Sequence, residues 1–206
     1  MSAVDPSKVD AVVLVGGKGT RLRPLTLSAP KPMLPTAGLP FLTHLLSRIA
    51  AAGIEHVILG TSYQAETFEA EFGDGSKLGL QIEYVYEDHP LGTGGAIANV
   101  IPKLRNDTVL VFNGDVLGGT DLRDLLAAHE ERGADLTIAF KQVDPSEANR
   151  FGIATLAPDG RVTSYEEKPR RPKSNLASLT IYVFKADVLA RRVVEAQGKV
   201  PTLAPA

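Results

Sequence analysis

The sequence predicts an α/β fold in which a mostly parallel sheet is flanked by helices, and two observations lead to this prediction. Short apolar runs, typical of buried strands, alternate with longer stretches of helical periodicity. A glycine-rich turn follows the first apolar run directly, at the place where open α/β sheets bind their ligands. Regular alternation of strand and helix favours crossover connections, and right-handed crossovers make such a sheet doubly wound.

The expected elements follow this pattern in chain order. Strands are predicted at residues 11–15, 57–59, 80–86, 108–112 and 136–140, with helices between them at 40–52, 64–72, 93–103 and 121–132. After about residue 150 the pattern changes, and residues 151–156 and 161–167 form a predicted hairpin around an Asp-Gly turn. A loop at 168–174, a strand at 178–184 and a short helix from about Ala186 come next. Residues 197–206 are expected to form an unstructured tail.

Composition narrows the class of protein. The 206 residues are 44% hydrophobic and carry a formal net charge of −2, which suits one soluble domain with a sizeable core. The charges are mixed along the chain, so no basic face predicts nucleic-acid binding. No cysteine is present, which excludes disulfides and thiolate chemistry. No apolar run approaches the ~18 residues of a membrane span and the N-terminus is polar, so we expect a cytoplasmic protein.

The segment at residues 16–35, GGKGTRLRPLTLSAPKPMLP, combines a flexible backbone with fixed positive charge. Gly16, Gly17 and Gly19 let the chain bend sharply and bring N–H groups close to a ligand, and Arg21 and Lys31 supply cations nearby. The segment therefore predicts a polyphosphate site. It matches neither the Walker loop, because Arg21 stands where the second glycine is needed, nor the dinucleotide fingerprint, whose third glycine is a leucine here. The alternative is a glycine-rich turn with solvated basic side chains.

Two further segments stand at the predicted ends of strands. Gly92, Thr93 and Gly94 open a helix, where small residues and free N–H groups suit close approach of a flat ring. Asp115 follows Gly114 at the end of the fourth strand, where a carboxylate is well placed to hold hydrated Mg²⁺. The alternative for Asp115 is a turn or a helix cap. The four histidines are scattered without metal-ligand spacing.

These motifs, GGxGTRLxPLT with KPMLP, LGTGG, FNGD and EEKP, occur here in the order in which they occur in the sugar-1-phosphate nucleotidyltransferases, and the chain resembles that family over residues 10 to 190. The resemblance implies a Rossmann-like nucleotidyltransferase fold and transfer of a nucleotidyl group from a nucleoside triphosphate to a sugar 1-phosphate. It implies that Arg21 and Lys31 act on the triphosphate and that Asp115 holds Mg²⁺. The implied nucleotide-binding residues are Gly16, Gly17, Gly19, Thr20, Arg21, Gly92, Thr93 and Gly94.

The same resemblance places the sugar phosphate late in the chain. It implies that Glu167 accepts sugar hydroxyls, that Lys168 binds the sugar phosphate and that the backbone of Gly152 faces the sugar. Gly114 and Ser178 complete the implied substrate-binding set. We thus expect one domain over residues 1–206, with a nucleotide-binding part at 10–135 and a sugar-phosphate-binding part at 136–190 that contains the small hairpin.

The sequence leaves alternatives for the identity of the substrates and for whether the chain contains every metal-binding residue of the family. Up to about residue 135 the chain looks closest to mannose-1-phosphate guanylyltransferases, whereas from about Glu147 it looks more like glucose-1-phosphate adenylyltransferases. We expect mannose 1-phosphate with GTP, with glucose 1-phosphate and ATP or another nucleotide as the alternative. The family's second metal-binding Asp, near a W/Y-x-D-x-G-T string, is absent, so we expect a C-terminally truncated chain. A catalytically weak binding module is therefore a further alternative, and homo-oligomer formation is left open.

Overall fold

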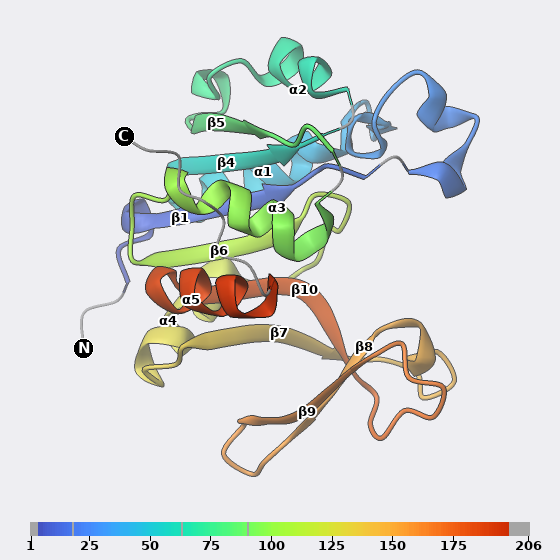
Figure 1. The fold of residues 1–206 in the computed structure, drawn as a ribbon, viewed down its shortest axis with the longest axis vertical. Coiled ribbons are helices and arrows are strands. Elements are labelled where there is room, and N and C mark those ends of the chain that lie inside the picture. The colour runs from blue at the N-terminus through green and yellow to red at the C-terminus, as the bar shows by residue number, and fades with distance from the viewer. Residues whose placement is uncertain (1–3, 18, 63, 90, 198–206) are drawn as a thin grey trace.

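A computed structural model describes residues 4–17, 19–62, 64–89 and 91–197 of the chain. Within them an eight-stranded sheet runs in the order β5-β4-β1-β6-β10-β8-β9, and β7 also pairs with β10 (Figure 1). The strands are β1 (Val9–Leu14), β4 (His56–Thr61), β5 (Gln81–Tyr86), β6 (Thr108–Asn113), β7 (Leu136–Gln142), β8 (Gly152–Leu156), β9 (Val162–Glu167) and β10 (Leu176–Lys185). The helices are α1 (Phe41–Ala51), α2 (Ala65–Phe72), α3 (Gly92–Val100), α4 (Leu122–Glu131) and α5 (Ala186–Gln197). A small separate ribbon joins β2 (Pro35–Thr36) to β3 (Leu39–Pro40).

The predicted mostly parallel sheet is confirmed. β5, β4, β1 and β6 pair in parallel. β10 is antiparallel to both β6 and β7, so β7 runs in the same direction as the four parallel strands. The carboxyl ends of these five strands consequently point the same way, which is the arrangement that gathers the following loops at one edge of a sheet.

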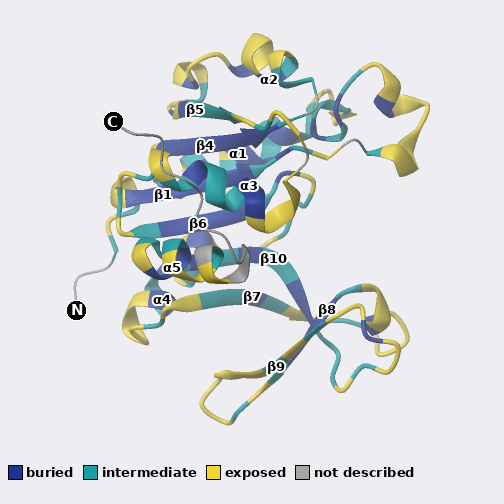
Figure 2. Cartoon of the chain, viewed as in Figure 1, coloured by how far each residue is buried: buried dark blue, intermediate teal, exposed yellow. Residues whose placement is uncertain are grey.

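Helices cover both faces of the sheet because the strands are apolar on both sides. Along β1, Val9, Ala11 and Val13 contribute to the core on the face covered by α1 and α4. Val12 points the other way, into the core formed with α3 and α5. This period of two places the central strands between two helical layers, and Figure 2 shows them as the most continuously buried part of the chain.

A buried polar network closes the amino-terminal edge of the sheet, at the opposite end of β1 from the glycine-rich segment. Asp10 is fully buried, and its carboxylate accepts hydrogen bonds from His56 Nδ1 (2.7 Å), from Asn106 Nδ2 (2.8 Å) and from the backbone N–H groups of Asn106 (2.9 Å) and Arg105 (2.6 Å). Burial raises the pKa of Asp10, but the hydrogen bonds outweigh it and leave the pKa below its ordinary value. The first strand was predicted at 11–15, but β1 begins at Val9. The prediction of its start was wrong because residues far along the chain supply the hydrogen bonds that allow Asp10 to be buried within the strand.

Two predicted elements, one in the middle of the chain and one near its end, have different boundaries in the structure. The predicted helix 93–103 ends at Val100, and Ile101–Lys103 forms a 3-10 turn, because Pro102 lacks the N–H that an α-helix needs there. Gln197, placed in the predicted tail, is the last residue of α5. The remainder of that tail, 198–206, lies outside the described residues. The predicted hairpin and the helix from Ala186 are confirmed.

A bulge in β10 connects the hairpin to the main sheet. The register against β7 shifts between Ser178 and Tyr182, and Thr180 within it has a φ of +55°. Beyond this bulge β10 pairs with β8, at Leu176 with Ala154 and Ala177 with Ile153. Bulges bend a strand, and Figure 1 shows the β8–β9 hairpin projecting from the body of the sheet at this point.

Among the helices of the described residues, none combines the length and the apolar character needed to cross a lipid bilayer.

Candidate functional site

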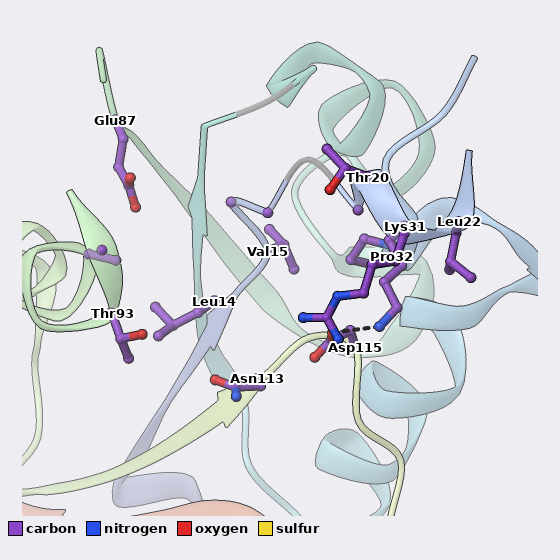
Figure 3. A pocket seen from close by; sticks show the side chains of 16 residues that line it. Leu14, Val15, Thr20, Leu22, Lys31, Pro32, Glu87, Thr93, Asn113 and Asp115 are labelled. Carbon is purple, nitrogen blue, oxygen red and sulfur yellow. Dashed lines mark hydrogen bonds and ion pairs between the residues drawn. The ribbon is translucent and has the colours of Figure 1, made fainter. Parts of the chain in front are cut away.

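A cavity of about 730 Å³ opens at the carboxyl ends of β1, β5 and β6 (Figure 3). The glycine-rich segment, the start of α3 and the turn after β6 form its walls. Its lining residues are Leu14, Val15, Gly16, Gly17, Gly19, Thr20, Arg21, Leu22, Lys31, Pro32, Glu87, Gly92, Thr93, Ala96, Asn113 and Asp115. Three segments that are far apart in the sequence thus meet in one cavity, as the rule for parallel sheets predicts.

The glycine-rich loop holds its shape through a buried threonine. Gly19 has a φ of +55°, and a Cβ there would come within 3.0 Å of both Lys31 Cβ and Thr26 Cγ2. The buried hydroxyl of Thr26 donates a hydrogen bond to the Gly19 carbonyl at 2.9 Å. Only glycine combines this backbone conformation with this close approach. The 3-10 turn Thr20–Leu22 follows and carries Arg21 into the cavity wall.

Lys31 and Asp115 form an ion pair at the cavity. The Lys31 ammonium lies 2.7 Å from Asp115 Oδ2, and the two side chains are 37% and 41% exposed (Figure 3). Lys31 begins a 3-10 turn and is flanked by Pro30 and Pro32, which restrict the backbone on either side. The pair joins the basic loop after β1 to the turn after β6, and it places both charges where a ligand can reach them.

Gly114 allows Asp115 to follow β6 so closely. Its N–H donates to the Leu14 carbonyl at 2.9 Å, and a Cβ on Gly114 would lie 2.4 Å from Val15 Cγ1. A side chain at this position would push the end of β6 away from β1. Gly114 is therefore required by packing beneath the cavity, and it does not itself belong to the lining.

The oxygen atoms near Asp115 can be compared with those that Mg²⁺ needs. Among the described residues no group of three His, Asp or Glu side chains comes together in a way that could hold a metal ion. Asp115 and the amide of Asn113 nevertheless place oxygen donors in the cavity. Since Mg²⁺ is commonly bound by one or two carboxylates together with substrate phosphates and water, this set fits an ion whose coordination the substrate completes.

The start of α3 forms the other side of the cavity. Gly92, with a φ of +70°, and Thr93 belong to the lining, whereas Gly94 does not. The predicted group of Gly16, Gly17, Gly19, Thr20, Arg21, Lys31, Gly92, Thr93 and Asp115 is thus brought together.

Sequence reasoning missed two polar residues in the lining, Glu87 and Asn113. Glu87 follows the last residue of β5 directly, and Asn113 ends β6. Both stand at carboxyl ends of parallel strands, so the rule that located the glycine-rich loop would also have found them.

The late predicted residues lie outside the cavity, on or next to the β8–β9 hairpin and on β10. Gly152 pairs with Glu167 across β8 and β9, and Lys168 Nζ lies 3.3 Å from Glu167 Oε1, with both side chains 62% exposed. Ser178, which is buried, lies at the bulge of β10. None of Gly152, Glu167, Lys168 and Ser178 lines the cavity.

Tyr165 packs directly over Gly152 on this hairpin. A Cβ on Gly152 would lie 2.0 Å from Tyr165 Oη and 2.9 Å from Glu167 Oε2, so glycine is required for the two side chains to keep their places. Burial, followed by the neighbouring Tyr182, raises the pKa of the Tyr165 phenol to about 12, and the group is neutral at physiological pH.

Comparison with known proteins identifies relatives over most of the chain. Residues 10–202 match the family described as nucleotidyl transferase. The chain is 65% identical to a mannose-1-phosphate guanylyltransferase of Mycobacterium tuberculosis over 89% of its own length and 51% of the relative's. It is 39% identical to a D-glycero-alpha-D-manno-heptose 1-phosphate guanylyltransferase of Aneurinibacillus thermoaerophilus, covering 82% of this chain and 71% of that one.

A solved structure shares the fold. It is a putative glucose-1-phosphate thymidylyltransferase from Bacillus anthracis in complex with a sucrose, with a TM-score of 0.81 and 25% identity, covering 88% of this chain and 73% of that one. The present chain spans about half the length of the mycobacterial relative.

Proposed function

The chain belongs to the nucleotidyl transferase family, and from this premise we propose that it transfers a guanylyl group from GTP to mannose 1-phosphate. A phosphate oxygen of the sugar phosphate attacks the α-phosphorus of GTP, the bond to the β-phosphate breaks, and pyrophosphate leaves. The names of the relatives support the choice of sugar and base. The single observation that carries the proposal is the cavity in which Arg21, Lys31 and Asp115 meet at the carboxyl ends of the strands.

The cavity supports this reaction because phosphoryl chemistry asks a protein mainly for positioning and charge stabilisation. Arg21 and Lys31 supply two fixed cations beside a loop of small residues. In the structure Lys31 is paired with Asp115, and the pair is half-exposed. An incoming triphosphate would compete with Asp115 for the Lys31 ammonium. Because the pair is partly exposed, Lys31 can exchange Asp115 for a phosphate at small cost.

The family generally uses a divalent metal ion, and we propose Mg²⁺ at Asp115 with Asn113 beside it. When bound, the ion would neutralise charge on the phosphate oxygens. Arg21 and Lys31 would neutralise the remaining negative charge and hold the phosphate groups in line for the attack. Gly16, Gly17, Gly19 and Thr20 would present the backbone to the triphosphate, and Gly92, Thr93 and Gly94 would lie towards the nucleoside.

We place the sugar phosphate at the hairpin. Glu167 and Lys168 are exposed and paired with each other at 3.3 Å, so a ligand can separate them at small cost. Lys168 would then bind the phosphate and Glu167 the sugar hydroxyls, while Gly152 and Ser178 would shape the space around them. Gly114 would contribute at the end of β6, where it lets Asp115 lie close to β1. Cytoplasmic location and homo-oligomer formation stay predictions.

The test is pyrophosphate release by the 206-residue chain with a panel of nucleoside triphosphates and sugar 1-phosphates. We expect GTP with mannose 1-phosphate to be the best pair, and Asp115→Asn to abolish release. Asp124→Asn, an exposed carboxylate on α4 outside the cavity, is the matched control and should leave release unchanged.

Two outcomes would contradict the proposal. A better rate with glucose 1-phosphate and ATP would replace the substrates. Nucleotide binding without release at any Mg²⁺ concentration would favour the catalytically weak binding module.

A further inference from the structure

Two hydroxyl groups hold backbone carbonyls of the glycine-rich loop. Ser62 follows β4 directly, is half-buried, and donates a hydrogen bond from its Oγ to the Gly16 carbonyl at 2.5 Å. The buried hydroxyl of Thr26 makes the corresponding bond to the Gly19 carbonyl at 2.9 Å. Gly16 and Gly19 belong to the cavity lining, whereas neither of the two hydroxyl-bearing residues does. Both hydroxyls therefore hold the loop from outside the cavity.

The sheet beneath the loop fixes the position of Ser62. The Val15 N–H donates to the Gly60 carbonyl at 2.9 Å, which continues the β1–β4 pairing beyond the end of β1. On the other side of β4, the Glu87 N–H donates to the Thr61 carbonyl at 2.9 Å, which continues the β4–β5 pairing. The residues just before Ser62 are thus hydrogen-bonded to both neighbouring strands, so its hydroxyl is a rigid anchor for the loop.

A hydroxyl that fixes a carbonyl also fixes the next N–H group. A peptide bond is planar and trans, so the carbonyl of one residue and the N–H of the next point in opposite directions. The bond to the Gly16 carbonyl therefore turns the Gly17 N–H away from Ser62. The bond from Thr26 does the same to the N–H of Thr20. Both N–H groups belong to residues that line the cavity, and among the described residues neither has a hydrogen-bond acceptor.

Such N–H groups suit an anion. Successive backbone N–H groups that converge on a concave surface bind phosphate oxygens, and Arg21 and Lys31 of the same cavity add positive charge. Peptides beside glycines turn easily when nothing holds them, because glycine restricts the backbone least. A loop whose peptides are already held in one direction loses less conformational freedom when a ligand binds.

We propose that Ser62 and Thr26 are positioning residues, whose hydroxyls aim two backbone N–H groups at the phosphates of the nucleotide. Ser62 sets the direction of the Gly17 N–H, and Thr26 sets that of the Thr20 N–H. The inference rests on the proposed function and deepens it, because it assigns two side chains outside the cavity to the preparation of the triphosphate site.

The experiment follows each N–H by NMR of the isotope-labelled 206-residue chain during titration with inorganic triphosphate. In the wild-type chain the amide protons of Gly17 and Thr20 should move downfield as they bind phosphate oxygens. Ser62→Ala should abolish the shift at Gly17 and keep the shift at Thr20. Thr26→Val, which has nearly the same shape but no hydroxyl, should do the reverse. Calorimetry should show a dissociation constant raised roughly tenfold in each variant, because one hydrogen bond to a charged group is lost.

Three variants are controls. Ser62→Thr and Thr26→Ser keep the hydroxyl and should restore both the amide shift and the affinity. Ser174→Ala removes a half-buried serine hydroxyl that also donates to a backbone carbonyl, that of Ala154 at 2.5 Å, but lies outside the cavity. It should leave both amide shifts and the affinity unchanged. Thermal unfolding of each variant verifies that it is folded.

The two amide signals separate positioning from a general effect on the loop. Loss of both shifts in each single variant would mean that the hydroxyls only keep the loop folded, and it would overturn the inference. Unchanged shifts in Ser62→Ala and Thr26→Val would overturn it as well, and so would a wild-type chain that does not bind inorganic triphosphate. If the shifts respond as expected but GTP and mannose 1-phosphate give no pyrophosphate release, the proposed function fails and the inference stands.

Discussion

Replacing Lys31 with alanine should separate its contribution to turnover from its contribution to stability. The ion pair with Asp115 has a separation of 2.7 Å, but the side chains are 37% and 41% exposed. Ion pairs at such exposure contribute about 0–1 kcal/mol to the free energy of unfolding. For a domain of this size a change of 1 kcal/mol moves the melting temperature by roughly 2–4 °C. The alanine keeps the Cβ that packs near Gly19, so no cavity is created in the core.

The expected effect on catalysis is much larger. A positioned cation that stabilises charge in the transition state contributes on the order of 3 kcal/mol, which corresponds to roughly a hundredfold in rate. Lys31→Ala, and likewise Arg21→Ala, should therefore lower kcat/KM for pyrophosphate release by about two orders of magnitude. The assays are steady-state pyrophosphate release and thermal unfolding, measured on the same preparations.

Lys185→Ala provides the matched control. Lys185 forms a comparable exposed ion pair with Asp135 at 3.2 Å, outside the cavity. This variant should change the melting temperature by a similar few degrees and leave turnover intact. A Lys31→Ala variant with near-normal turnover would refute the catalytic assignment. A fall in melting temperature far beyond that of Lys185→Ala would show instead that the loss of activity is a loss of folded protein.

Substitutions at three further positions test other parts of the structure. Gly152→Ala should weaken sugar-phosphate binding in calorimetry while GTP binding stays near normal, because its Cβ would displace Tyr165; equal loss of both ligands would contradict a separate sugar site. Asp10→Ala should lower the free energy of unfolding at pH 7 by about 3–5 kcal/mol, measured in urea. Because its folded pKa is lowered, the contribution of Asp10 is present above the unfolded pKa of about 3.9 and is lost as pH falls through the folded pKa, so Asp10→Asn should flatten the acid limb of the stability curve. Thr180→Gly should raise the unfolding free energy by about 1 kcal/mol through relief of the positive φ, and Thr180→Ala, which keeps a Cβ, should not; equal effects would show that the bulge is not strained.

Sequence alone predicted the features that depend on short-range chemistry. The apolar runs of 57–59 and 108–112 identified β4 and β6, since strands buried on both faces are apolar throughout. The rule that ligands bind at the carboxyl ends of parallel strands predicts that the glycine-rich loop, Thr93 and Asp115 lie near one another, and the three line one cavity. The roles of these side chains remain predictions for the assays above.

Only the tertiary structure decided the features that depend on partners far along the chain. β10 inserts between β6 and β7, a pairing that no local pattern reveals. Asp10 lies within β1 because His56 and Asn106 satisfy its charge, although a lone polar residue predicts the end of a buried strand. Glu87 stands at a strand end that the sequence could indicate, but its place beside Gly16 follows from the β4–β5 pairing, which only the tertiary structure shows. Turn chemistry and hydrophobic periodicity act over a few residues, whereas strand order and buried charge depend on contacts between residues tens of positions apart.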